Sequence, residues 1–242
     1  TVSNPRTQLW AAAITDSTVD ETQITRVELP LERAAAPRFA PDSSLWYLAS
    51  RGGSDGVWRQ RGPEAVEIWR PAQGPVTDHA AIAPDAQRAC APVQRGGRAT
   101  LHCFAEGRAG STVLADELHV QGPASWSPDG AWLAVAAVDS AGVRIFKVPS
   151  SGGRATRLVD SVAFNPVWSP DGRFIVYSHA PRGRSVSLAA VTPEGAPHSL
   201  PPLTVDRLGD SYRFLPGGGQ LVVKLGGFRQ QDFWLFDLAS GA

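Results

Sequence analysis

The sequence predicts an all-β fold, a β-propeller of four-stranded antiparallel blades, and three observations lead to this class. A short element with a Pro-Asp-Gly type turn recurs five times in 242 residues, a short apolar run follows each copy, and helix signals are nearly absent. The turn prolines are 43, 44, 42 and 46 residues apart, at Pro41, Pro84, Pro128, Pro170 and Pro216. A period in the low forties that carries short strands is typical of β-propellers.

The repeated element is a hairpin turn, shown most clearly by WSPDG at residues 168–172. In a type I turn, proline presets φ at the second position, Asp is tolerated at the third and Gly is favoured at the fourth. Because apolar runs lie on both sides, each copy predicts two strands joined by a tight turn. The element is therefore interpreted as structural and not as a site.

Each repeat also predicts the order of its strands, labelled A to D from the axis outward. A large apolar side chain stands two residues before each proline and is expected to pack against the neighbouring blade, since one blade cannot bury its own faces. These side chains are Phe39, Ile82, Trp126, Trp168 and Phe214. An apolar strand B follows the turn, then a strand C such as residues 143–148, a Gly-rich turn and an outer strand such as residues 155–159.

The chain is interpreted as a single propeller domain, residues 1–242. Four blades are predicted at 31–75, 76–120, 121–161 and 162–205, followed by a last blade without its outer strand at 206–242. Residues 1–30 resemble the outer strands C and D of an incomplete blade. Either residues 22–29 supply the outer strand of the last blade and close the ring, or the full domain has six or more blades. The second is favoured, because strand C at the start otherwise has no place.

Composition excludes several function classes. The content of 43% hydrophobic and 19% charged residues fits an ordinary globular domain, and a net charge of zero argues against nucleic acid as a partner. No apolar stretch approaches the roughly 20 residues that span a bilayer, so no membrane insertion by this segment is expected. The five histidines do not cluster at metal-ligand spacing, so neither a metal nor another cofactor is predicted. Because no Met is present, even at position 1, the chain is interpreted as part of a longer protein.

The five copies of the [WF]-[SA]-P-D-[GS] element resemble the repeats of TolB-like propellers, which are related to WD-repeat propellers, over about 200 residues. The stretches YLASRGGSDGVWR (47–59), NPVWSPDGRFIVYS (165–178) and YRFLPGGGQLVV (212–223) also resemble the C-terminal propeller of bacterial transmembrane serine/threonine protein kinases. That resemblance implies a sensing or protein-binding role, a membrane-anchored parent chain and an extracytoplasmic location; otherwise the chain is expected in the cytoplasm. The motifs of the kinase domain itself are missing, so no kinase activity is expected.

Two stretches look catalytic at first sight. Residues 52–56, Gly-Gly-Ser-Asp-Gly, match the G-x-S-x-G nucleophile elbow, and Gly209-Asp210-Ser211 is similarly suggestive. A nucleophile elbow needs a strand-to-helix turn on a parallel sheet, whereas Ser54 lies at a hairpin tip between strands B and C. No catalytic residue is therefore predicted. Prolyl-oligopeptidase-type peptidases carry a propeller, but their nucleophile sits in a hydrolase domain that this chain lacks.

The two cysteines are predicted to face each other across one hairpin. A two-residue turn at Gly96-Gly97 pairs Arg95 with Arg98, and the same register pairs Cys90 with Cys103. Opposed Cβ atoms lie about 4.5–5.5 Å apart, which suits a disulfide. The alternative is a pair of buried thiols in a cytosolic protein.

A binding site is expected at the mouth of the central channel, on the segments that enter strand A. Aligning the repeats shows polar residues that interrupt an otherwise apolar or small layer, five and six residues before the turn prolines: Asp78, His79, Asn165, Asp210 and Ser211. Turn capping is the alternative explanation for them. Trp58 and Trp69 could form an exposed aromatic contact instead, but packing between blades is favoured for them.

The predicted function is a non-catalytic module that binds a protein or a small molecule of unknown identity, as the sensory or interaction domain of a larger signalling protein such as a serine/threonine kinase. The alternative is the accessory, substrate-gating propeller of a peptidase. Fold alone does not name the ligand.

Overall fold

The repeated turns form as expected and each is closed by a backbone hydrogen bond. The residue before each proline accepts from the amide three positions on, as in Ser127–Gly130 and Ser169–Gly172, both 2.9 Å. The fourth turn residue has positive φ in every copy, 69° at Gly130 and 75° at Gly172 but also 63° at Ser43. Gly is favoured here because this left-handed conformation costs other residues about 1–2 kcal/mol.

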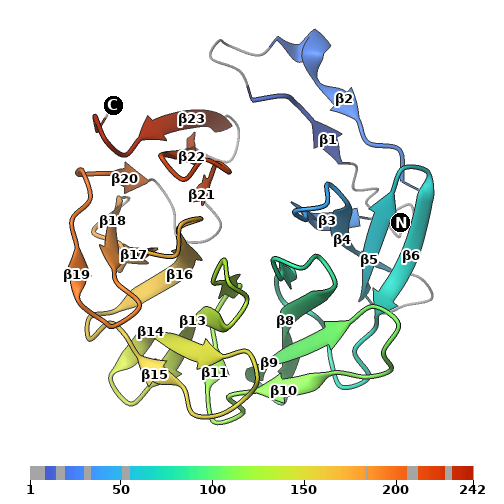
Figure 1. The fold of residues 1–242 in the computed structure, drawn as a ribbon, viewed down its shortest axis with the longest axis horizontal. Helices are drawn as coiled ribbons and strands as arrows, with labels where there is room; N and C mark the ends of the chain where they lie inside the picture. Colours follow the sequence, from blue (N-terminus) through green and yellow to red (C-terminus); the bar gives the residue numbers. More distant parts are fainter. Residues whose placement is uncertain are drawn as a thin grey trace.

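These turns join the inner two strands of antiparallel sheets that stand around a common centre (Figure 1). The computed structural model describes residues 9–14, 20–29, 34–50, 55–183, 185–205, 212–226 and 231–241. Within these ranges the only helix is the 3-10 turn η1 (Glu21–Gln23), which is too short to cross a membrane. The chain is an all-β propeller with five blades, which confirms the predicted fold class.

The strands follow the predicted order from the centre outward. The first blade is β3 (Ala34–Phe39), β4 (Leu45–Ser50), β5 (Asp55–Arg61) and β6 (Glu64–Trp69). The second is β7 (Ala81–Ile82), β8 (Arg88–Arg95), β9 (Arg98–Ala105) and β10 (Thr112–Leu114). The third is β12 (Ser125–Trp126), β13 (Trp132–Asp139), β14 (Gly142–Pro149) and β15 (Thr156–Arg157). The third blade also contains β11 (His119–Val120), which pairs with β13. The predicted boundary had instead assigned these two residues to the end of the second blade.

The fourth blade is β16 (Ala163–Trp168), β17 (Ile175–His179), β18 (Val186–Val191) and β19 (Pro197–His198), and β20 (Thr204–Val205) also pairs with β18. In the fifth blade the described residues form three strands, β21 (Tyr212–Phe214), β22 (Gln220–Gly226) and β23 (Gln231–Asp237). Before the first blade, β1 (Trp10–Ala11) pairs with β2 (Thr25–Arg26) as a separate two-stranded sheet. Among the described residues β2 therefore does not supply the outer strand of the fifth blade, so that route to ring closure is not the one observed.

The core lies between the blades. Trp126, two residues before its turn proline, is only 9% exposed, and its indole N–H donates to the carbonyl of Ala81 in the second blade at 3.0 Å. Trp168 packs in the same way on Ala134 and Ile145 of the third blade. Burying one such side chain contributes about 1.5–3 kcal/mol. Trp58 and Trp69 are buried too, and Trp69 stacks on Phe104 of the second blade with ring centroids 4.4 Å apart.

Candidate binding site in the central channel

The innermost strands place polar side chains at the centre of the ring. In β3 and β16 the pairing register shifts, between Ala35 and Arg38 and between Phe164 and Val167. At these bulges Ala36 and Asn165 have φ of 52° and 49°, a left-handed conformation that Asn tolerates better than most residues. Asn165 is buried, and its carbonyl accepts a hydrogen bond from the hydroxyl of Tyr212 on β21.

His79 lies at the centre of the cluster and is only 4% exposed. Its Nδ1 is 2.8 Å from Oδ1 of Asp78, which also accepts from the His79 amide at 2.8 Å. The Nη2 of Arg213, from the fifth blade, is 3.0 Å from Nε2, and the Nη2 of Arg38, from the first blade, is 3.0 Å from Nδ1. One imidazole thus contacts side chains that are 41 and 134 residues away in the sequence.

These contacts fix the protonation of the ring. The carboxylate of Asp78 can only accept and the guanidinium of Arg213 can only donate, so the tautomer with its proton on Nδ1 makes both of these hydrogen bonds. Arg38 cannot accept from Nδ1–H, so in this tautomer its guanidinium contacts Nδ1 without a hydrogen bond. Burial is the main cause that lowers the pKa of His79 to about 4, although the hydrogen bond with Asp78 acts against it. His79 is therefore neutral near pH 7.

The three ionisable side chains around His79, those of Arg38, Asp78 and Arg213, are charged near pH 7. Burial lowers the pKa of Arg38 to about 9 and that of Arg213 to about 10, so both stay protonated near pH 7. Burial raises the pKa of Asp78, but the hydrogen bonds and charge interactions with His79 and Arg38 outweigh this, and the pKa lies below its usual value. The charges of Arg38, Asp78, His79 and Arg213 alone therefore sum to one positive charge.

Asp78 and Asn165 approach each other across the third blade. Gly122, with φ of 73°, separates them: a Cβ on this glycine would lie 3.5 Å from Oδ1 of Asn165 and 4.0 Å from Oδ2 of Asp78. The structure therefore brings together three of the predicted site residues, Asp78, His79 and Asn165. The other two, Asp210 and Ser211, lie outside the described residues, as does Ser54 of the G-x-S-x-G match.

Sequence reasoning missed Arg38 and Arg213. Both stand three residues before a turn proline, where the other repeats carry Ala81, Ser125 and Val167. Two arginines in an otherwise small or apolar column were the available signal. The register shift in β3, which the repeat alignment does not show, lies directly before Arg38.

The cysteine pair lies away from this cluster, in the second blade. Cys90 on β8 pairs directly with Cys103 on β9, and Arg95 pairs with Arg98, so the register is the one deduced from the Gly96-Gly97 turn. The two sulfurs form a disulfide with a Cα–Cα distance of 4.0 Å.

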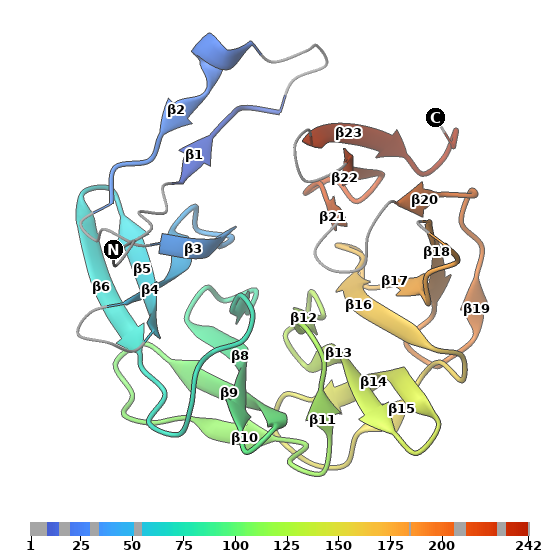
Figure 2. The same cartoon turned by 180° about the vertical axis from the view of Figure 1, so that it is seen from behind.

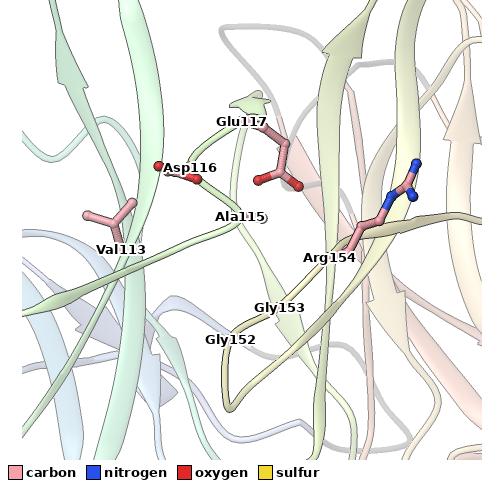
Figure 3. A pocket seen from close by; sticks show the side chains of 7 residues that line it. All are labelled: Val113, Ala115, Asp116, Glu117, Gly152, Gly153 and Arg154. Carbon is pink, nitrogen blue, oxygen red and sulfur yellow. The ribbon is translucent and has the colours of Figure 1, made fainter.

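A pocket of about 480 Å³ lies between the second and third blades. It is lined by Val113, Ala115, Asp116, Glu117, Gly152, Gly153 and Arg154. Figure 3 shows the acidic side chains of Asp116 and Glu117 on one side and that of Arg154 on the other. It is open, and no group of three or more metal-ligating side chains occurs in the described part of the chain. The channel cluster, which draws on four blades, is the better candidate site.

Comparison with known proteins supports the fold. TolB from Acinetobacter baumannii superposes with a TM-score of 0.73 at 16% identity, over 89% of this chain and 54% of that one. The putative TolB from Agrobacterium tumefaciens gives 0.68 at 18% identity, over 90% and 82%. A structure from a study of two prolyl endopeptidases gives 0.62 at 14% identity, over 92% and 36%. The chain thus spans about half the length of the first TolB structure. No protein-family model and no curated protein matches its sequence. The fold is that of TolB-like propellers, and such low identities show no more than the fold.

Proposed function

We propose that the chain is a non-catalytic binding module whose ligand docks at the central channel. The observation that carries this proposal is the convergence of Arg38, Asp78, His79, Asn165 and Arg213 from four blades. Bringing the charged side chains of Arg38, Asp78 and Arg213 together inside the protein costs stability, because charged groups lose hydration on burial. The likeness to TolB propellers supports a binding role in the same coarse sense.

The chemistry of the cluster favours an acidic group on the ligand. Two guanidinium groups, those of Arg38 and Arg213, contact the two nitrogens of one neutral imidazole. A carboxylate carries one negative charge and accepts paired N–H donors from arginine. A peptide with an acidic side chain or a free C-terminal carboxylate fits best.

Sequence resemblance and the disulfide support a proposal for the wider setting. We infer that the module is the sensory or interaction domain of a larger bacterial signalling protein such as a serine/threonine kinase. The Cys90–Cys103 bridge supports an extracytoplasmic location, since disulfides persist in oxidising compartments. The likeness to a prolyl endopeptidase structure keeps a second candidate, the accessory propeller of a peptidase.

Peptide binding tests the site directly. We would measure the affinity of a panel of short peptides with free and amidated C-termini by calorimetry, for the unchanged chain and for Arg213→Gln. Binding of the free acids should weaken by at least about tenfold in Arg213→Gln, because a charged hydrogen bond contributes about 1.5–3 kcal/mol. Arg173→Gln, which changes an exposed arginine of the fourth blade, is the control and should bind normally. If the unchanged chain and Arg213→Gln bind the free acids with equal affinity, the binding site lies elsewhere.

Enzyme assays test whether the chain itself is catalytic. Peptidase, esterase and ATP hydrolysis assays should stay at background for this chain. An activity that disappears in Ser54→Ala would contradict the non-catalytic proposal.

A further inference from the structure

The segment that enters the third blade leaves an unfilled position in the channel at Gly122. Gly122 stands six residues before its turn proline, where the second blade carries Asp78. Strand β12, which follows Gly122, lies beside β16, the strand of Asn165, at the centre of the ring (Figure 2). Because glycine has no Cβ, the backbone adopts its φ of 73° without strain and the space where a Cβ would stand stays open.

Two oxygen atoms face this position. A Cβ on Gly122 would lie 3.5 Å from Oδ1 of Asn165 and 4.0 Å from Oδ2 of Asp78. Among the described residues no other atom outside the neighbouring residues of the chain lies within 4 Å of that point. Since N–H···O hydrogen bonds span about 2.7–3.2 Å, a nitrogen at this point is within about 1 Å of hydrogen-bond distance from both oxygens.

The carboxylate of Asp78 has an oxygen to offer here. Its Oδ1 accepts from the backbone amide of His79 and from Nδ1 of the same residue, both at 2.8 Å. Its Oδ2 accepts no hydrogen bond within the described part of the chain. The side chain of Asp78 is 33% exposed and Gly122 is half-buried, so a ligand can reach this position from solvent.

The position suits a compact, positively charged group that only donates hydrogen bonds. A primary ammonium group has three N–H donors and no acceptor, and its hydrogen bonds to a carboxylate are charge-assisted. A guanidinium group is planar and larger than the single methyl group that this position would accept. Metal ions that prefer oxygen take about six or more ligands, and the described residues contain no group of three or more metal-ligating side chains.

The proposed carboxylate site lies directly beside this position. Nη2 of Arg38 and Oδ1 of Asp78 approach the same nitrogen of His79, at 3.0 and 2.8 Å. A ligand that reaches both Arg38 and Asp78 therefore carries its carboxylate and its ammonium group only a few bonds apart. An acidic residue with a free amino group has this arrangement.

We propose that Gly122, Asp78 and Asn165 form a subsite for a primary ammonium group, and that the ligand of the channel presents the free amino group of an acidic residue to it. The carboxylate part of this inference rests on the proposed function, whereas the ammonium subsite needs only the three residues just named. The same chemistry has two sources, the N-terminal Asp or Glu of a peptide and a free acidic amino acid.

Acetylation of the amino group tests the subsite. We would compare Glu-Ala-Ala amide with its N-acetyl form by calorimetry, because both keep the side-chain carboxylate and only the first has the ammonium group. The free peptide should bind at least about tenfold more tightly, since hydrogen bonds between charged groups are the stronger ones. Free L-glutamate is the third probe: tighter binding of the tripeptide identifies a peptide as the source, and tighter binding of glutamate identifies a free amino acid.

Filling the position should abolish the preference for the free amino group. Gly122→Ala places a methyl group beside the two oxygens and should bind the free and acetylated peptides with equal affinity. Gly172→Ala is the matched control, because its φ of 75° gives the same backbone strain at a turn of the fourth blade, and it should keep the full preference. Asp78→Asn keeps an acceptor but removes the charge, and it should reduce the preference without any change at Gly122.

A probe without a carboxylate separates the subsite from the proposed function. Titration with methylammonium chloride, followed by NMR, should shift the side-chain amide signals of Asn165 saturably, and sodium chloride should not. If no peptide binds but methylammonium shifts these signals, the proposed function fails and the subsite stands. Equal affinity of the unchanged chain for the free and acetylated peptides, or the absence of a saturable shift with methylammonium, would overturn the inference.

Discussion

Lowering the pH from 7 to 5 should destabilise the folded chain through His79. In the unfolded chain its pKa is about 6.5, whereas burial holds it at about 4 in the folded state. Between these values the unfolded state binds a proton that the folded state does not. The free energy of unfolding therefore falls as the pH drops through this window and is independent of His79 above about pH 7.5.

The size of the effect follows from the shift. One pKa unit corresponds to about 1.4 kcal/mol, so the change from 6.5 to about 4 amounts to about 3 kcal/mol over the whole window. About 2 kcal/mol of this falls between pH 7 and pH 5. A domain is commonly stable by about 5–15 kcal/mol, so a loss of this size is measurable.

Urea unfolding at pH 7, 6 and 5, followed by tryptophan fluorescence, measures it for the unchanged chain and for His79→Gln. Glutamine keeps a donor and an acceptor near Asp78 and Arg213 but does not titrate. Burial also lowers the pKa of His102, but this group is present in both proteins, so the difference between them isolates His79. Parallel pH profiles for the two proteins would refute the reasoning, and so would a His79 NMR titration near pH 6.5.

Three further predictions concern the blades. Trp126→Ala should lower the free energy of unfolding by about 3–5 kcal/mol, because it empties a site between two blades; a loss below about 1 kcal/mol in urea unfolding would contradict that packing. Gly172→Ala should cost about 1–2 kcal/mol, since φ is 75° and the new Cβ would lie 3.4 Å from Pro128, whereas Gly219→Ala, with open space, should be near neutral in the same assay. Thiol titration of the unfolded, unreduced protein should find no free thiol. Reducing the Cys90–Cys103 bridge should cost less than the roughly 3 kcal/mol of the chain-entropy estimate, because the hairpin already restrains the loop; two thiols before reduction would disprove the bridge.

The fold was predictable because its signals are local. Each Pro-Asp turn and the apolar runs beside it fall within about a dozen residues, and their chemistry determines a hairpin wherever it lies. The register of the cysteine hairpin followed in the same way from one two-residue turn. The period of the repeats then indicated a propeller before any distant contact was known.

The candidate site was predictable only in part. Asp78, His79 and Asn165 could be found because they interrupt a repeat. Arg38 and Arg213 could not be joined to them, since their approach to His79 depends on strands from the first and fifth blades meeting in the channel. The repeat also predicted that all five large apolar side chains before the turn prolines pack against a neighbouring blade, and this prediction is wrong for Phe39, which is 70% exposed.

The sequence by itself determined the class of fold, the positions of the turns and the order of strands within each blade, because turn chemistry and alternating burial act over a few residues. Only the tertiary structure decided which side chains share the channel, that β2 pairs with β1 and not with the fifth blade, and which faces stay uncovered. Those outcomes depend on how successive blades are placed around the ring, and interactions between residues up to 134 positions apart leave no local pattern.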